Sequence, residues 1–240
     1  MPDLWPAIAV SVFVAIHVSG YRLRWLAHAP RSIWLSLAGG SSVAYVFLHL
    51  LPELAQGQRA LEGAMPGELV SGLEKHIYLL ALAGLTLFYG LERLASGSRL
   101  KTQEGAQATG TGVFALHIAS FASYNFLIGY LLVHGERSDL FFYATAMGLH
   151  FLVNDNALRE HHKARYDRLG RWLLAAAVLA GWALGNQLEI AEVWVQVLIA
   201  LLAGGIILNV MKEELPSERA SRFWAFFLGA AAYGALILLA

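Results

Sequence analysis

Residues 139–158 read DLFFYATAMGLHFLVNDNAL, an apolar run that ends in His150, Asn154, Asp155 and Asn156. A membrane-spanning helix needs roughly 20 mostly apolar residues, and this run has that length. An aspartate at the centre of such a helix costs about 2.5–3.5 kcal/mol on insertion scales. A buried histidine or asparagine still needs a hydrogen-bonding partner. Polar side chains in this position normally face the interior of a helix bundle and mark a site or a pathway.

The composition of the whole chain is that of a membrane protein. Of its 240 residues, 58% are hydrophobic and 14% are charged, and the mean hydropathy is +0.55. Soluble domains carry about 25% charged residues. The formal net charge is zero, so the total charge does not suggest a nucleic-acid partner. The chain has no cysteine, which excludes disulfides and thiolate metal sites.

Eight windows are long and apolar enough to span a membrane, so we expect an all-α integral membrane protein, one eight-helix domain over residues 1–240. The windows are 4–21, 33–53, 76–95, 111–133, 139–158, 170–188, 192–211 and 222–240. The longest connections are expected at 54–75 and 96–110, and the second has the composition of a flexible linker. The first window follows Asp3 rather than a basic segment, so we expect a retained helix and not a signal peptide.

The distribution of Lys and Arg predicts how the chain is oriented. All 17 of these residues except Arg59, Lys75 and Arg137 lie in the connections after the first, third, fifth and seventh windows. Connections rich in Lys and Arg stay on the cytoplasmic side. We therefore expect both termini on the outer side of a bacterial inner membrane.

Two of the windows resemble each other. The tetrapeptide LAGG occurs at 37–40 and again at 202–205, and each copy is followed by Leu-Pro and a nearby glutamate. The two helices are expected to run in opposite directions, as in the inverted repeats from which many transporters are built. Coincidence explains the pattern equally well, because small residues are common where membrane helices pack together.

Within the window 139–158, His150 and Asn154 are four residues apart and therefore share one helix face. Imidazole, amide and carboxylate groups are ligands of borderline metal ions. We therefore expect His150, Asn154 and Asp155 to contribute to a metal site. The alternative is structural, because polar side chains in membrane bundles often only bond to one another. In that case Arg159 is the expected ion-pair partner of Asp155.

The preceding window, 111–133, carries a matching stripe of polar side chains. His117, Tyr124 and Asn125 lie along one helix face, at depths similar to those of the next window's polar residues. We expect the two stripes to face each other across the bundle, with His117 and Asn125 as further metal ligands and Tyr124 on the transport pathway. For either metal ligand taken singly, a structural role is the alternative.

Polar residues at the helix ends indicate where a solute would enter and leave. His49 and Glu53 lie at the outer end of the second window, and His161 and His162 come after the fifth window on the cytoplasmic side. Each pair also has a simpler interpretation as interfacial or solvated residues. His17, near the inner end of the first window, is interpreted as a core histidine whose bonds are satisfied.

These features resemble the ZIP family of divalent metal transporters. The segments FLHLLPEL (47–54), LFYGLERL (87–94) and LLAGGIILNVMKEELP (201–216) look like parts of the family's helices 2, 3 and 7. The resemblance spans nearly the whole chain and implies a ZIP-like bundle, with helices 1–3 and 6–8 as an inverted repeat around helices 4 and 5. It implies a divalent metal ion such as Zn, Mn, Fe or Cd as substrate, no organic cofactor, membrane lipid as surroundings and a homodimer as an option.

The chain departs from the family at the site itself. The family's helix 4 pattern is His-Asn-x-x-Glu/Asp-Gly, and here Tyr124 replaces the histidine and Ile128 the acid, while the asparagine and glycine match. In the helix 5 pattern, His-x-x-Pro-Glu/His, His150 matches, but Val153 and Asn154 replace the last two positions. We therefore expect a transporter, not an enzyme, with altered or weakened metal selectivity.

Two alternatives stay open at this point. One is a ZIP-like membrane protein that keeps the fold and does not transport, and acts as a partner subunit, a sensor or a structural protein. The other is an intramembrane metal-dependent hydrolase with His117, His150 and Asp155 around one ion. Hydrolysis needs an open coordination position and a group to handle the proton, so it requires these side chains to converge.

Overall fold

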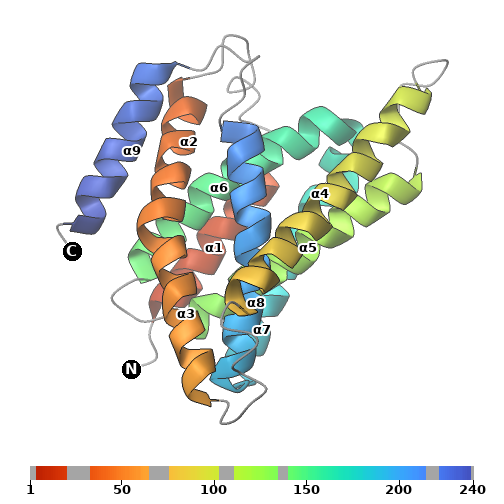
Figure 1. The fold of residues 1–240 in the computed structure, drawn as a ribbon. Helices are drawn as coiled ribbons and strands as arrows, with labels where there is room; N and C mark the ends of the chain where they lie inside the picture. The colour runs from red at the N-terminus through yellow and green to blue at the C-terminus, as the bar shows by residue number, and fades with distance from the viewer. Residues whose placement is uncertain are drawn as a thin grey trace.

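The structure is a computed structural model that describes residues 4–20, 33–64, 76–102, 111–134, 140–214 and 222–238, and this part of the chain is all-helical (Figure 1). Eight helices are found there, one for each predicted window. They are α1 (Leu4–Ser19), α2 (Ile33–Tyr45) continued by η2 (Val46–Leu50) and α3 (Leu51–Ala64), α4 (His76–Thr102), α5 (Thr111–His134), α6 (Leu140–His162), η3 (Tyr166–Gly170) continued by α7 (Arg171–Gly185), α8 (Glu192–Asn209) continued by η4 (Val210–Glu214), and α9 (Phe223–Leu238). The η segments are π-helical turns.

Long apolar helices indicate an integral membrane protein. Within the described residues, four stretches are long and apolar enough to cross a membrane: Ile33–Arg59, Ile77–Leu94, Phe114–His134 and Val193–Lys212. α1 and α9 are apolar but shorter. Large apolar side chains such as Trp34, Leu87 and Phe227 are exposed on the outside of the bundle, where hydrocarbon would cover them.

Two helices extend furthest beyond their predicted ends. Connections were expected to begin at residues 54 and 96, but α3 continues to Ala64 and α4 to Thr102. In the first case the helix contains Pro52, whose ring would clash with the carbonyl group one turn earlier in a regular α-helix. The π-helical turn η2 ends at Leu50, two residues before Pro52, and its wider turn accommodates the ring without ending the helix. In the second case the residues Arg-Leu-Lys at 99–101 are good helix formers.

The helices pack in pairs that are distant in sequence. α2 lies against α9, α4 against α8 and α5 against α7, and the first of these pairs is seen in Figure 1 as the adjacent orange and blue helices. α1 contacts both α7 and α6. The helices of a pair run in the same direction. In the α5/α7 pair, for example, Ile118 lies beside Gly170 and Val133 lies beside Gly185.

Reciprocal glycine contacts hold the α2/α9 pair together. A Cβ atom added to Gly40 would lie 1.9 Å from the carbonyl oxygen of Phe226, and one added to Gly229 would lie 2.0 Å from the carbonyl oxygen of Leu37. Both positions therefore accept only glycine while the two backbones keep this distance. Small residues that allow such close approach are typical of helix contacts in membranes.

The α4/α8 pair repeats the same contacts. A Cβ atom on Gly204 would lie 1.9 Å from the carbonyl oxygen of Ala81, and one on Gly84 would lie 2.1 Å from that of Leu201. The α5/α7 pair uses the same kind of contact, with Gly181 against a carbonyl group of α5. All three parallel pairs are thus fixed by backbone contact as well as by side-chain packing.

The α2/α9 and α4/α8 pairs also agree in the position of the π-helical turn that follows the contacting glycine. The π-helical turn η2 begins at Val46, six residues after Gly40, and η4 begins at Val210, six residues after Gly204. The two LAGG segments therefore correspond with a shift of one residue, because the contacting glycine is the fourth letter of the first copy and the third letter of the second. An alignment of the two LAGG sequences letter by letter misses this shift of one residue.

The two pairs run in opposite directions. Gly57, in the middle of α3, lies against Gln196, near the start of α8, and α2 contacts η4 at the end of α8. The helix that begins with α2 is therefore antiparallel to α8. α2 also contacts α6, and α4 also contacts α5. These contacts position α5 and α6, which carry half of the buried polar residues in the described part of the chain.

Candidate functional site

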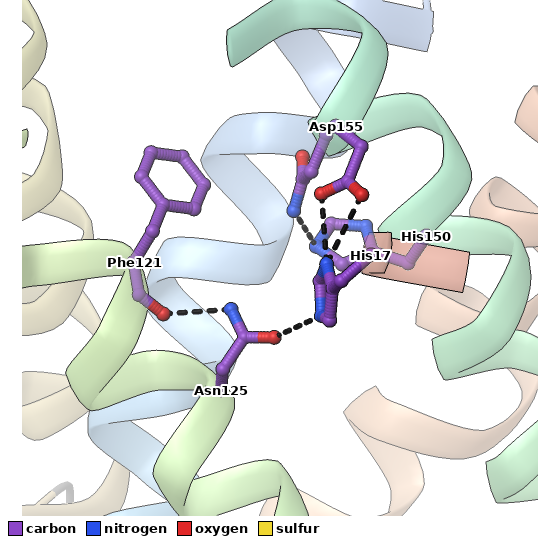
Figure 2. A network of polar contacts seen from close by, with 6 residues as sticks. His17, Phe121, Asn125, His150 and Asp155 are labelled. Atoms are coloured by element: carbon purple, nitrogen blue, oxygen red, sulfur yellow. Dashed lines mark hydrogen bonds and ion pairs between the residues drawn. The ribbon is translucent and has the colours of Figure 1, made fainter. Parts of the chain in front are cut away.

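A buried polar network joins α1, α5 and α6 (Figure 2). Nδ1 of His17 lies 2.9 and 3.1 Å from the two carboxylate oxygens of Asp155, and Nε2 of His17 lies 2.8 Å from Oδ1 of Asn125. All three side chains are buried. The alternative partner of Asp155, Arg159, donates instead from Nε to Oδ1 of Asp167 at 2.9 Å.

The orientation of Asn125 fixes the number of protons in this network. Nδ2 of Asn125 donates to the carbonyl oxygen of Phe121 at 2.7 Å, so its Oδ1 faces His17 and requires a donor there. Nε2 of His17 must therefore carry a proton. A second proton must lie between Nδ1 and Asp155, because two acceptors cannot bond to each other. Whether imidazole or carboxyl holds that proton, the pair of His17 and Asp155 is neutral as a whole, which permits its burial.

Aromatic contacts position the two helices that carry this pair. The ring of Phe151 on α6 lies 5.0 Å from that of Phe13 and 4.7 Å from that of His17, measured between centroids. Phe13 and His17 are four residues apart on α1, as are Phe151 and Asp155 on α6. One face of each helix therefore supplies both the aromatic and the polar contact.

His150 forms a second buried group between α5 and α6. Its Nε2 lies 2.7 Å from the hydroxyl oxygen of Tyr124 and 2.8 Å from Nδ2 of Asn154. The structure thus brings together the two predicted stripes, with Tyr124 on α5 against His150 on α6. His150 is only 2% exposed, and its Nε2 is already in contact with Tyr124 and Asn154. A cation therefore reaches Nε2 only after the side chains of Tyr124 and Asn154 move.

His117 belongs to a further cluster, at the other end of α6. Its Nδ1 lies 2.9 Å from Nε2 of His162, and its Nε2 lies 3.4 Å from a carboxylate oxygen of Glu92. The second carboxylate oxygen of Glu92 is 2.9 Å from Nζ of Lys212. The ring of His161 lies close by, 6.4 Å from that of His117. This cluster links α4, α5, α6 and η4.

A cavity of about 740 Å³ lies at the opposite end of α5 and α6, where α5 ends and α6 begins. His49 and Glu53 both line it, together with Tyr45, Tyr143 and Glu189. η2 positions His49, whose ring is stacked on that of Tyr45 with a centroid distance of 5.2 Å and an interplanar angle of 24°. The two residues that the sequence placed at one end of the second window therefore face one cavity.

The expected metal ligands are held by different partners. Within the described residues, no group of three or more His, Cys, Asp or Glu side chains could hold a metal ion. The five expected ligands divide into His150 and Asn154 with Tyr124, Asn125 and Asp155 with His17, and His117 with His162 and Glu92. The set expected for a hydrolase, His117, His150 and Asp155, is divided among all three groups.

Three residues of these networks were not among the sequence candidates. His17 was expected to be a bonded core histidine, and it is also the link between Asn125 and Asp155. Glu92 and Lys212 join the His117 cluster from helices that are far apart in sequence. The four-residue spacing of Phe13 and His17, matched by Phe151 and Asp155, was the signal available for His17.

No protein-family model, curated protein or solved structure matches this chain. What the protein does is therefore inferred from its own residues.

Proposed function

We propose that the protein is a ZIP-like membrane transporter of divalent metal ions, with altered or weakened metal selectivity, built on an inverted repeat. The observation that carries this proposal is the helix pair that occurs twice. The α2/α9 and α4/α8 pairs share their glycine contacts and the position of their π-helical turns, and they run in opposite directions. Inverted repeats of this kind, with polar groups at the repeat interface, are typical of transporters.

The proposed path runs along α5 and α6 through the membrane. With both termini on the outer side of a bacterial inner membrane, the cavity lined by His49 and Glu53 is the outer entrance. The ion then passes His150 and Asn154, whose nitrogen and oxygen atoms replace part of its hydration shell. The cluster that contains His117 lies on the cytoplasmic side, at the other end of the same two helices.

The charge along this path accounts for altered selectivity. A divalent cation that leaves water needs negative charge as well as ligand atoms. His150, Asn154 and Tyr124 supply none, and the carboxylate of Asp155 is already matched by the proton that it shares with His17. We therefore expect weak binding and fast release rather than tight zinc binding.

Reconstitution in liposomes tests the proposal. We expect saturable flux of at least one of Zn, Mn, Fe and Cd, reduced about tenfold or more by His150→Ala and by Asn154→Ala, because each removes a ligand of the moving ion. Asn186→Ala is the matched control, since Asn186 lies after α7 and donates to the carbonyl oxygen of Trp182. Absence of flux for every ion, with folded protein that binds no metal by mass spectrometry, would contradict the proposal.

A second candidate function is a ZIP-like protein that does not transport and serves as a partner subunit, sensor or structural protein. The bonds of His150 to both Tyr124 and Asn154 favour it, because a satisfied imidazole needs no metal ion. This candidate predicts that His150→Ala and Asn154→Ala leave cellular metal content unchanged. The same two variants therefore separate the two functions.

A further inference from the structure

We propose that the cavity between α3, α5, α6 and α8 binds a small organic ammonium ion. This ligand class goes beyond the metal ions of the proposed function, and the inference concerns binding, so it does not depend on transport. Size, charge and the character of the walls each support it.

The cavity is larger than a metal ion requires. Its volume is about 740 Å³. A metal ion with six water molecules needs about 180 Å³, at about 30 Å³ for each water. Pockets for small organic ligands have volumes of about 300–1,000 Å³. The volume therefore fits an organic molecule with space for a few waters.

The charged residues of the cavity favour a cation. Glu53 on α3 and Glu189 in the connection between α7 and α8 both line it, and among its described lining residues none is Lys or Arg. Gln56 and Gln196 add amide oxygens that accept hydrogen bonds. Acidic groups in a concave surface with apolar walls raise the local concentration of cations. An anionic ligand is disfavoured for the same reason.

The remaining walls favour an organic cation over a bare metal ion. The rings of Tyr143 and His49 line the cavity, and His49 covers one face of Tyr45, which also lines it. Aromatic faces attract ammonium groups, which is how proteins recognise quaternary ammonium ligands. Leu202 and Ile206 of α8 give an apolar side that can contact alkyl groups. A metal ion would instead need converging ligands, and no such group is found in the described part of the chain.

Choline is the probe for the test, because it combines a quaternary ammonium group with a small polar body. Its carbon isostere, 3,3-dimethylbutan-1-ol, has the same shape without the charge. Equilibrium dialysis of the purified full chain in detergent should show saturable binding of one choline for each chain. The isostere should not compete, and salt should weaken binding because exposed charges are screened.

Variants locate the binding in the cavity. Glu53→Gln and Glu189→Gln should each weaken choline binding about tenfold, which corresponds to about 1.4 kcal/mol. Glu160→Gln removes the same charge from the other end of α6 and should leave binding unchanged. Thermal unfolding of each variant confirms that it is folded.

Three results would overturn the inference. They are no saturable choline binding by the folded wild-type chain, equal binding of the uncharged isostere, and binding that persists in the Glu53→Gln/Glu189→Gln double variant. Zn²⁺ binding that depends on the two glutamates, without choline binding, would identify a simple ion entrance instead. Metal flux without choline binding would support the proposed function and reject this inference. Choline binding without metal flux would support this inference and reject the proposed function.

Discussion

The two ends of the bundle share one backbone arrangement and use it differently. Six residues after Gly40 on α2, and six residues after Gly204 on α8, the helix enters a π-helical turn. The first turn brings His49 to an open cavity, whereas the second brings Lys212 to Glu92. The backbone at the two π-helical turns is therefore equivalent, whereas the side chains on the turns differ. One end opens to a cavity, and the other is held together by a partly exposed ion pair.

The π-helical turn is what allows this difference. It widens the helix for one turn without ending it, so the side chains after the turn point in a different direction and contact different residues. The backbone contacts before the turn stay equivalent in the two copies, and only the residues on the turn decide what each end does. Changes in the shared parts should therefore affect the whole molecule, and changes on the turns should affect one end.

The largest effect is expected from the network on which both ends depend. His17→Leu leaves the carboxyl group of Asp155 buried without its partner, and breaking a buried pair in this way costs about 3–5 kcal/mol. Unfolding in detergent, followed by tryptophan fluorescence, measures the loss. The double variant His17→Leu/Asp155→Leu should recover part of it, because no unpaired charge then remains. A single variant as stable as the wild type would show that the pair is not what joins α1 to α6.

The shared glycine contacts should give the next largest effect, and nearly the same one at both ends. Gly40→Ala and Gly204→Ala each place a Cβ atom 1.9 Å from a backbone oxygen, so the helices must move apart. Overpacking of this kind costs about 1–3 kcal/mol. Gly90→Ala is the control, because a Cβ atom there has nothing within 4 Å and alanine favours a helix. Unequal losses at Gly40 and Gly204 would break the equivalence of the two pairs.

The sequence predicted the positions of the helices better than it predicted which side chains of different helices contact each other. Apolar windows predict helices, and all eight helices were found, four of them long and apolar enough to cross a membrane, because length and hydropathy are properties of one segment. Periodicity also placed Tyr124 and His150 on facing sides. The periodicity of one segment does not show which other segment it contacts. The link of His17 to Asp155 and the pair of Glu92 and Lys212 were therefore missed. The LAGG repeat was visible, but its shift of one residue depends on backbone contacts that letters do not encode.

A smaller effect should distinguish the two ends. Glu92→Gln removes one charge of the pair with Lys212, and because that pair is partly exposed the loss should be about 1 kcal/mol or less. Glu189→Gln, which changes an exposed side chain at the cavity end, should change stability by no more than about 0.5 kcal/mol. A double-mutant cycle of Glu92→Gln with Lys212→Met isolates the pair, and its coupling energy should fall as salt is added. Equal losses for both glutamates would remove the contrast between an open and a linked end.

A similarly small effect is expected between the two ends, where Tyr124 bonds to His150. Tyr124→Phe removes one hydrogen bond, worth about 0.5–1.5 kcal/mol, but the same nitrogen keeps its contact with Asn154 and is not left unpaired. For a chain of this size, 1 kcal/mol lowers the unfolding temperature by about 2–4 °C, which scanning fluorimetry resolves.

Comparison with Tyr124→Phe/Asn154→Leu then tests whether water reaches His150 in the resting protein. The double variant leaves the buried nitrogen of His150 without either neighbour, so its loss should exceed the sum of the two single losses. Simple additivity would mean that water already reaches His150 in the resting protein. In that case the cavity end extends to the middle of the bundle, and the closed part of the molecule begins only at His117.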